Sequence, residues 1–240
     1  VEMQKKKVVV VEGLIGSGKT TLSRELGAAL GDSTLTLFEP DEKDDGGKVG
    51  NPYLADYYTD PARWSFVLQV HQLQARYRMH LQAQWHAMQG FGHAVLDRSY
   101  FGDTAFARLQ LADGYMSRRE FDTYASIYHA MTASVMLPTV CLRVLAKPEV
   151  CERRVAKRME AETGRKCEEA IDLKYLRGLD REIDHMVAVL RKQGVTILDV
   201  PWDTDRSTPD ERRGAVEALA ARITALEPPD FFLDMHRRAL

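Results

Sequence analysis

The sequence predicts an α/β fold in which five parallel strands form one sheet with helices on both faces, a three-layer arrangement. Two observations predict it. Five short apolar runs alternate along the chain with longer segments of helical pattern. The first run leads directly into a glycine-rich loop and a helix, the order of a strand–loop–helix unit. The length of 240 residues suits a single domain, which we take to be residues 1–240.

The expected strands are short and apolar, and they cover residues 7–11, 34–38, 94–97, 140–145 and 195–198. The helices between them begin at recognisable residues. Pro61 suits the first turn of a long helix, Ser117 opens a capping box, and Asp172 is an N-cap. The expected helices cover residues 21–30, 61–89, 118–136, 148–158, 173–193 and 209–226.

Charge and cysteine content exclude several functional classes. The formal net charge of −2 argues against a surface that coats nucleic acid. The valine run at residues 8–11 is too short for a signal peptide or a membrane span. Cys141, Cys151 and Cys167 form neither a metal-binding spacing nor an even disulfide set, which favours reduced thiols in an intracellular, most simply cytoplasmic, protein. We therefore expect no nucleic-acid and no membrane partner.

Residues 13–20 fit the phosphate-binding pattern G-x-x-x-x-G-K-[ST], which predicts a P-loop NTPase-type fold. Glycines let backbone N–H groups turn toward phosphate oxygens, and the following helix adds positive charge at its N-terminus. Lys19 is expected to reach the β- and γ-phosphates, and the Thr20 hydroxyl to bind Mg²⁺. A glycine turn with a chance lysine is the alternative. The expected ATP-binding residues of this loop are Gly13, Gly16, Ser17, Gly18, Lys19, Thr20 and Thr21.

Polar residues follow the second and third expected strands, and the carboxyl ends of parallel strands share one edge of the sheet. Glu39 is placed to accept a proton from an attacking hydroxyl; otherwise it is a solvated carboxylate. Asp97 is a candidate Mg²⁺ ligand, directly or through water. Arg98 is suited to neutralising phosphate charge or steadying Glu39, with a structural ion pair as the alternative.

Two further groups of residues carry polar chemistry. Arg154 and Arg158 lie four residues apart on one helix face and could clamp a phosphoryl group as part of an arginine-rich lid over about residues 154–170. Gln69, Gln72 and Arg76 form a polar stripe on the long helix, and a glutamine amide suits the edge of a nucleobase. Each group has the same alternative, a solvated helix face.

The chain resembles the deoxyribonucleoside kinases of the deoxycytidine, deoxyguanosine and deoxyadenosine kinase group. The resemblance covers about residues 8–200 and rests on separate blocks in the right order. They are GLIGSGKTT at residues 13–21, Glu39-Pro40, Tyr58-x-x-Pro61-x-Arg63-Trp64-Ser65-Phe66-x-x-Gln69, Asp97-Arg98-Ser99-x-x-x-Asp103, the Arg154/Arg158 pair and Asp172-Leu173-x-Tyr175-Leu176-x-x-Leu179.

This resemblance implies ATP-dependent 5′-phosphorylation of a deoxyribonucleoside with Mg²⁺, by a homodimer. Glu39 looks like the general base for the 5′-hydroxyl, and Arg98 like the arginine that orients it. Asp97 stands where the family has an acidic residue near Mg²⁺. Lys19, Arg154 and Arg158 look like the groups that act on the transferred phosphoryl group, with Arg158 also at ATP.

The resemblance also assigns the nucleoside pocket. Tyr58 and Glu168 look like the pair that bonds the sugar 3′-hydroxyl, Gln69 like the amide that reads the base, and Trp64 like a pocket wall. Arg76 and Asp103 match a pair found in members that accept deoxycytidine or purine deoxynucleosides rather than thymidine. Further lid and pocket positions depart from the family: residues 159–164 lengthen the lid before Arg165, and Leu68 and Ala107 replace frequent aromatic residues.

Two competing interpretations remain. A nucleoside monophosphate kinase of the thymidylate kinase type also has a P-loop, a Glu-Pro and an Asp-Arg at these places, but gives no reason for the Tyr58-to-Gln69 block. A non-catalytic structural or nucleotide-sensing relative on the same fold would not need Lys19, Glu39 and Arg98 together.

Overall fold

The computed structural model describes residues 6–38, 51–133, 135–161, 171–203 and 209–227. Its centre is a five-stranded sheet in the order β2-β3-β1-β4-β5, with every neighbouring pair parallel. The predicted sheet is confirmed. The strands are β1 (Val8–Gly13), β2 (Leu35–Leu37), β3 (Ala94–Asp97), β4 (Val140–Leu145) and β5 (Thr196–Pro201).

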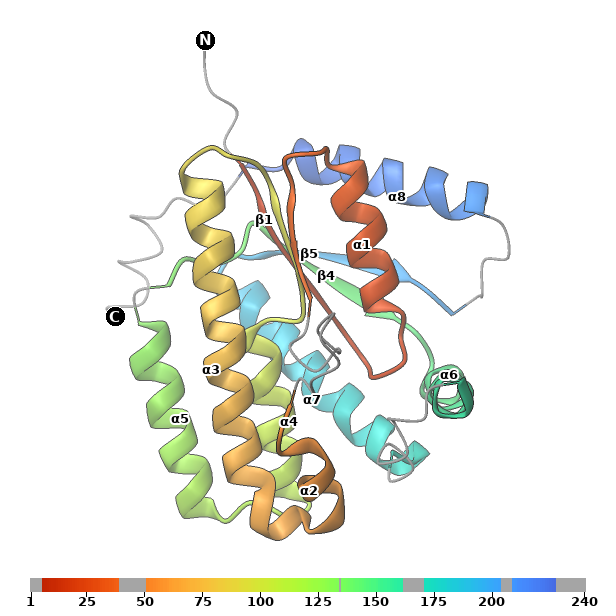
Figure 1. Ribbon diagram of the computed structural model, residues 1–240. Coiled ribbons are helices and arrows are strands. Elements are labelled where there is room, and N and C mark those ends of the chain that lie inside the picture. Colours follow the sequence, from red (N-terminus) through yellow and green to blue (C-terminus); the bar gives the residue numbers. More distant parts are fainter. Residues whose placement is uncertain (1–5, 39–50, 134, 162–170, 204–208, 228–240) are drawn as a thin grey trace.

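Helices cover both faces of the sheet (Figure 1). On one face lie α1 (Lys19–Ala29) and α8 (Pro209–Thr224). On the other lie α3 (Pro61–Met88), α4 (Tyr100–Ala112) and α7 (Leu173–Lys192), with α5 (Arg118–Thr132) packed outside α3. The remaining helices, α2 (Leu54–Thr59) and α6 (Pro148–Ala161), contact α3 and α7 respectively.

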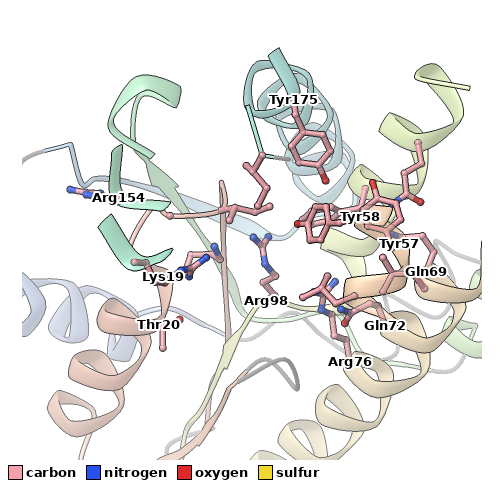
Figure 2. Close-up of a pocket in the computed structure, with 18 of the residues that line it drawn as sticks. Lys19, Thr20, Tyr57, Tyr58, Gln69, Gln72, Arg76, Arg98, Arg154 and Tyr175 are labelled. Atoms are coloured by element: carbon pink, nitrogen blue, oxygen red, sulfur yellow. The ribbon is translucent and has the colours of Figure 1, made fainter. Parts of the chain in front are cut away.

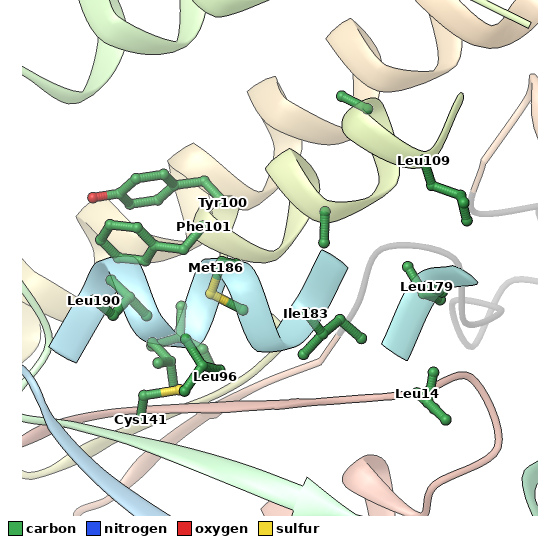
Figure 3. Packing of buried hydrophobic residues seen from close by; sticks show 14 of the residues in the cluster. Leu14, Leu96, Tyr100, Phe101, Leu109, Cys141, Leu179, Ile183, Met186 and Leu190 are labelled. Atoms are coloured by element: carbon green, nitrogen blue, oxygen red, sulfur yellow. The ribbon is translucent and has the colours of Figure 1, made fainter. Parts of the chain in front are cut away.

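The central strand β1 explains why a run of valines begins the fold. Val10 packs into the core beneath α4 and α7, whereas Val9 and Val11 pack into the core beneath α1 and α8. A strand covered on both faces needs apolar residues at consecutive positions rather than alternating ones. Figure 3 shows the first core, where Leu96 and Cys141 from the sheet face Ile183, Met186 and Leu190 of α7. The start of the glycine loop is therefore held by both cores.

The starts of α3, α5 and α7 agree with Pro61, Ser117 and Asp172 as expected from the sequence, and Asp60 adds an N-cap that was not predicted. The Asp60 side chain accepts a hydrogen bond from the Arg63 N–H at 3.3 Å. Ser117 and Glu120 form the complete capping box of α5. The Asp172 carboxylate accepts from the Tyr175 N–H at 2.7 Å. Helices α2 and α4 were not predicted. Helix α6 extends to Ala161, beyond the expected end at residue 158, and none of the helices in the described parts of the chain is long and apolar enough to cross a membrane.

Candidate functional site

The glycine loop after β1 requires glycine for two separate reasons. Gly16 and Gly18 have φ angles of +76° and +93°, in the left-handed region that favours residues without a Cβ. Their neighbours also leave no room for a side chain. A Cβ on Gly16 would lie 2.7 Å from the carbonyl oxygen of Cys151 in α6, and one on Gly18 would lie 2.6 Å from Nε1 of Trp202. The loop is therefore held closely against both α6 and the end of β5.

The loop brings Lys19 and Thr20 to the start of α1. Lys19 is buried, and its ammonium donates to the carbonyl oxygen of Leu14 at 2.7 Å. The Thr20 hydroxyl donates to Oδ2 of Asp97 at 2.5 Å, which joins the first helix to the carboxyl end of β3. This contact follows from register, because β1 and β3 are paired with Val11 opposite Asp97. A hydroxyl and a carboxylate at this place are the hard oxygen ligands that Mg²⁺ prefers.

Arg98 lies directly after β3 and is buried in an uncommon backbone conformation, with a φ of +68°. Its N–H donates to the Val11 carbonyl oxygen at 3.0 Å, and its Nη1 to the Gly13 carbonyl oxygen at 3.1 Å. The guanidinium carbon lies 5.0 Å from the centre of the Phe106 ring. Since left-handed backbone is costly for a residue with a Cβ, these contacts hold the arginine at a defined place.

One cavity of about 400 Å³ connects the loop to the helices on the other face. Figure 2 shows Lys19 and Thr20 on one side of Arg98, and Tyr58, Gln69 and Arg76 on the other. This volume lies within the range of small-molecule sites. The lining residues are Ile15, Gly16, Gly18, Lys19, Thr20, Thr21, Leu54, Tyr57, Tyr58, Leu68, Gln69, Gln72, Arg76, Arg98, Phe106, Gln110, Arg154, Arg158, Ile171 and Tyr175.

The polar stripe of α3 faces this cavity and is not a solvated surface. Gln69, Gln72 and Arg76 are all buried, so that alternative is wrong. Arg76 forms a buried ion pair with Asp103 of α4, which lies behind the lining. Oε1 of Gln69 has no hydrogen-bond partner within the described ranges. A buried amide oxygen without a partner is available to a polar ligand.

A tyrosine cluster at the same end was missed at the sequence level. Tyr57, Tyr175 and Gln110 line the cavity together. Burial raises the pKa of Tyr57 and Tyr175, so both phenols stay protonated at neutral pH. Tyr175 belongs to the block at residues 172–179 that carries the family resemblance, and Tyr57 directly precedes Tyr58. Those positions were the available signals.

Arg154 and Arg158 of α6 also line the cavity. Arg154 has a further structural role. Its Nη1 donates to the Ser17 carbonyl oxygen at 3.3 Å and its Nη2 to the Trp202 carbonyl oxygen at 3.0 Å. This guanidinium thus ties the glycine loop to the residue that follows β5.

Several expected residues lie elsewhere. Trp64 is absent from the cavity lining of the described chain; its ring packs 5.8 Å from that of Tyr53, with the Arg63 guanidinium 5.2 Å from its centre. Helix α3 therefore turns Gln69 inward and Trp64 toward α2. Glu39, Arg165 and Glu168 fall outside the residues that the structure describes. Among those it does describe, no group of three His, Cys, Asp or Glu residues could hold a metal ion alone.

Comparisons with known proteins agree with this geometry. A family model described as "Deoxynucleoside kinase" matches residues 9–220. The chain is 30% identical over 197 residues to a deoxyguanosine kinase of Dictyostelium discoideum, which covers 82% of this chain and 64% of that protein. It is 33% identical over 177 residues to a deoxyadenosine/deoxycytidine kinase of Bacillus subtilis, covering 71% of this chain and 76% of that one.

Solved structures show the same fold. The deoxyadenosine kinase from M. mycoides with bound dATP matches with a TM-score of 0.70 and 19% identity, covering 90% of this chain and 99% of that one.

A deoxyadenosine kinase of Dictyostelium discoideum is 31% identical over 71% of this chain and 62% of its own length. The chain thus spans less than two thirds of the length of the two Dictyostelium relatives.

Proposed function

Because the chain belongs to the deoxynucleoside kinase family, we propose that it transfers the γ-phosphoryl group of ATP to the 5′-hydroxyl of a deoxyribonucleoside. One observation carries this proposal. A single cavity joins the phosphate-binding loop to a buried polar pocket, and Arg98 lies between the two ends. Phosphoryl transfer depends mainly on positioning and on neutralising charge, and a cavity with this arrangement supplies both.

At the donor end, Lys19 and the loop N–H groups would bind the β- and γ-phosphates of ATP. Arg154 and Arg158 line the same end and would neutralise charge on the transferred group. Thr20 and Asp97 would hold Mg²⁺, since their oxygens already lie 2.5 Å apart at the helix start. When bound there, the cation neutralises charge on the phosphate oxygens.

At the acceptor end, Glu39 would accept the proton of the 5′-hydroxyl, and Arg98 would orient that oxygen. Tyr58 and Glu168 would bind the 3′-hydroxyl of the sugar. Support for these roles comes from the cavity, which Tyr58 and Arg98 line, and from the matching motifs.

The polar pocket favours bases that carry an exocyclic amino group. Gln69 lines the cavity, and its Oε1 is a buried acceptor without a hydrogen-bond partner among the described residues. Adenine, guanine and cytosine present an amino donor, and thymine does not. We therefore propose purine deoxynucleosides, deoxycytidine or both as substrates rather than thymidine.

One assay separates the competing functions. ATP consumption with Mg²⁺ is measured with the four natural deoxynucleosides, with deoxynucleoside monophosphates, and with no acceptor. Turnover with deoxynucleosides supports the proposal; turnover only with monophosphates indicates a monophosphate kinase, and no turnover indicates a non-catalytic protein. Lys19→Ala is the control and should abolish activity. Glu39→Gln should lower kcat by roughly 10²–10⁴ without abolishing nucleoside binding.

A homodimer is also proposed, and α3 offers the surface for it. Leu81, Trp85 and Met88 lie on one face of α3 at spacings of four and three, and they are 37%, 62% and 60% exposed. Phe91, just beyond the helix, is 62% exposed. A contiguous apolar stripe is typical of an interface between subunits. Sedimentation equilibrium should give a dimer for the native chain and a monomer for Trp85→Glu; a native monomer would contradict this proposal.

A further inference from the structure

Glu12 interrupts the apolar β1 strand at the position before Gly13 and is 0% exposed. Its Oε1 accepts two hydrogen bonds from Ser99, from the backbone N–H at 2.9 Å and from the hydroxyl at 2.6 Å. Its Oε2 has no hydrogen-bond partner within the described ranges. The carboxylate does not line the cavity of those residues. It is therefore a buried acid next to the site but not in it.

A carboxylate at this place is costly, because burial in an apolar strand removes it from water. The pKa of Glu12 is raised, because the effect of burial exceeds the opposing effects of the charges of Arg98 and Arg76 and of the hydrogen bonds from Ser99. The preceding residues Val8 to Val11 show that an apolar side chain suits this strand. A cost of this kind persists in a protein when the group has a task.

The surroundings of Glu12 indicate that task. Three consecutive residues of β1 each hold one part of the segment that follows β3. The Val11 carbonyl oxygen accepts from the Arg98 N–H, the Glu12 carboxylate from the Ser99 N–H, and the Gly13 carbonyl oxygen from the Arg98 guanidinium. The peptide groups on both sides of the Arg98 Cα are thus fixed to β1. This double attachment stabilises the left-handed conformation with φ +68°.

We propose that Glu12 is a positioning residue for phosphoryl transfer, acting through Ser99 and Arg98. It fixes the backbone that aims the Arg98 guanidinium into the cavity, and its negative charge compensates the buried positive charge of Arg98. The proposal rests on the proposed function, in which Arg98 orients the 5′-oxygen. If Glu12 only stabilised the fold, replacing it would lower the amount of active enzyme. That loss would be the same whether or not Arg98 is present.

Glu12→Gln removes the charge and keeps an acceptor for the Ser99 N–H. We expect kcat to fall by about 10- to 100-fold, because misplacing a catalytic group by on the order of 1 Å costs about 10²-fold. The KM values for ATP and nucleoside should change much less than kcat, since Glu12 itself does not line the cavity. The thermal midpoint is measured on the same sample so that loss of folded protein is not read as slow turnover.

A second variant moves the carboxylate without changing its charge. A Cβ on Gly102 would lie 2.6 Å from Oε2 and 2.9 Å from Oε1 of Glu12. The carboxylate is the far end of a flexible side chain, so Gly102→Ala should displace it while the helix tolerates alanine well. We expect the same fall in kcat for Gly102→Ala, which keeps the test decisive if Glu12→Gln does not fold.

Both substitutions are also made in a protein that already carries Arg98→Ala. If Glu12 acts through Arg98, Glu12→Gln and Gly102→Ala should cause no further loss of kcat when Arg98 is already absent. The proposal is overturned if either folded variant keeps the native kcat, or if either lowers kcat as much in the Arg98→Ala background. A native chain that phosphorylates no deoxynucleoside would instead refute the proposed function, so the two failures are distinct.

Discussion

Replacing Gly18 with alanine tests how the glycine loop between β1 and α1 is held in place. Gly18 is the N-cap residue of α1 and has a φ of +93°. An added Cβ would lie 2.6 Å and 2.7 Å from Nε1 and Cδ1 of Trp202. The Trp202 ring cannot swing away freely, because it is buried in the core beneath α1 and α8. The substitution therefore carries both a backbone cost and a packing cost.

The two costs are of similar size. A left-handed conformation costs a residue with a Cβ about 1–2 kcal/mol. Forcing a methyl group into a packed core costs about 1–3 kcal/mol. Gly18→Ala should therefore lower the free energy of unfolding by about 2–5 kcal/mol, the sum of these terms. It should also weaken ATP binding, because the N–H groups at the start of α1 must move with the loop.

Two other glycines serve as matched controls in urea unfolding. Gly114 has a φ of +76° and no atom within 4 Å of an added Cβ, so Gly114→Ala should show the backbone cost alone. Gly214, inside α8, has open space and an ordinary φ, so Gly214→Ala should stabilise the protein by about 0.5–1 kcal/mol. If Gly18→Ala and Gly114→Ala lose equal stability, the Trp202 contact does not hold the loop and the reasoning is refuted.

Two further predictions concern buried ionisable groups. Asp103→Ala should lower the free energy of unfolding by about 3–5 kcal/mol, because it leaves Arg76 buried without this ion pair. The double variant Arg76→Met with Asp103→Ala should lose less unfolding free energy, and urea unfolding measures both values. If the double variant keeps the native base preference, the pair is only structural. His93 accepts the Lys7 N–H on Nδ1 at 3.1 Å, and burial, with the charges of Lys6 and Lys7, lowers its pKa. The unfolded chain then binds more protons than the folded chain below about pH 6.5, so stability should fall as pH decreases through that value. His93→Gln should reduce this slope in urea midpoints measured at several pH values, and an identical slope would contradict the assignment.

Local patterns were sufficient to predict the sheet and the glycine loop between β1 and α1. The valine run of β1, the glycine spacing and the capping box at Ser117 each depend on neighbours in sequence. Helix α4 was missed because eight of its thirteen residues are buried, including Gly102 and Asp103, so no polar face marks it. Amphipathic periodicity predicts a helix only when one face meets water.

Contacts between distant segments explain the rest. Gln69 and Gln72 resemble surface residues when α3 is considered alone; they are buried because the cavity, which Phe106 and Gln110 of α4 also line, lies against that face. Arg154 bonds the Ser17 and Trp202 carbonyl oxygens, which lie 137 and 48 residues away in the chain. Sequence spacing carries no information on such contacts. The same holds for Glu12, which at the sequence level only ends an apolar run.

The order of the strands explains why the loop and Arg98 meet. Strands β1 and β3 are adjacent, yet the chain leaves β1 into α1 on one face of the sheet and leaves β3 into α4 on the other. Connections that diverge from neighbouring strands open a crevice at their carboxyl ends, which is where ligands bind in such sheets. Asp97 and Arg98 stand at this divergence, so Asp97 bonds Thr20 of α1 while Arg98 lies beside Phe106 of α4. Any change that shifts the register of β3 against β1 should therefore disturb both ends of the cavity together.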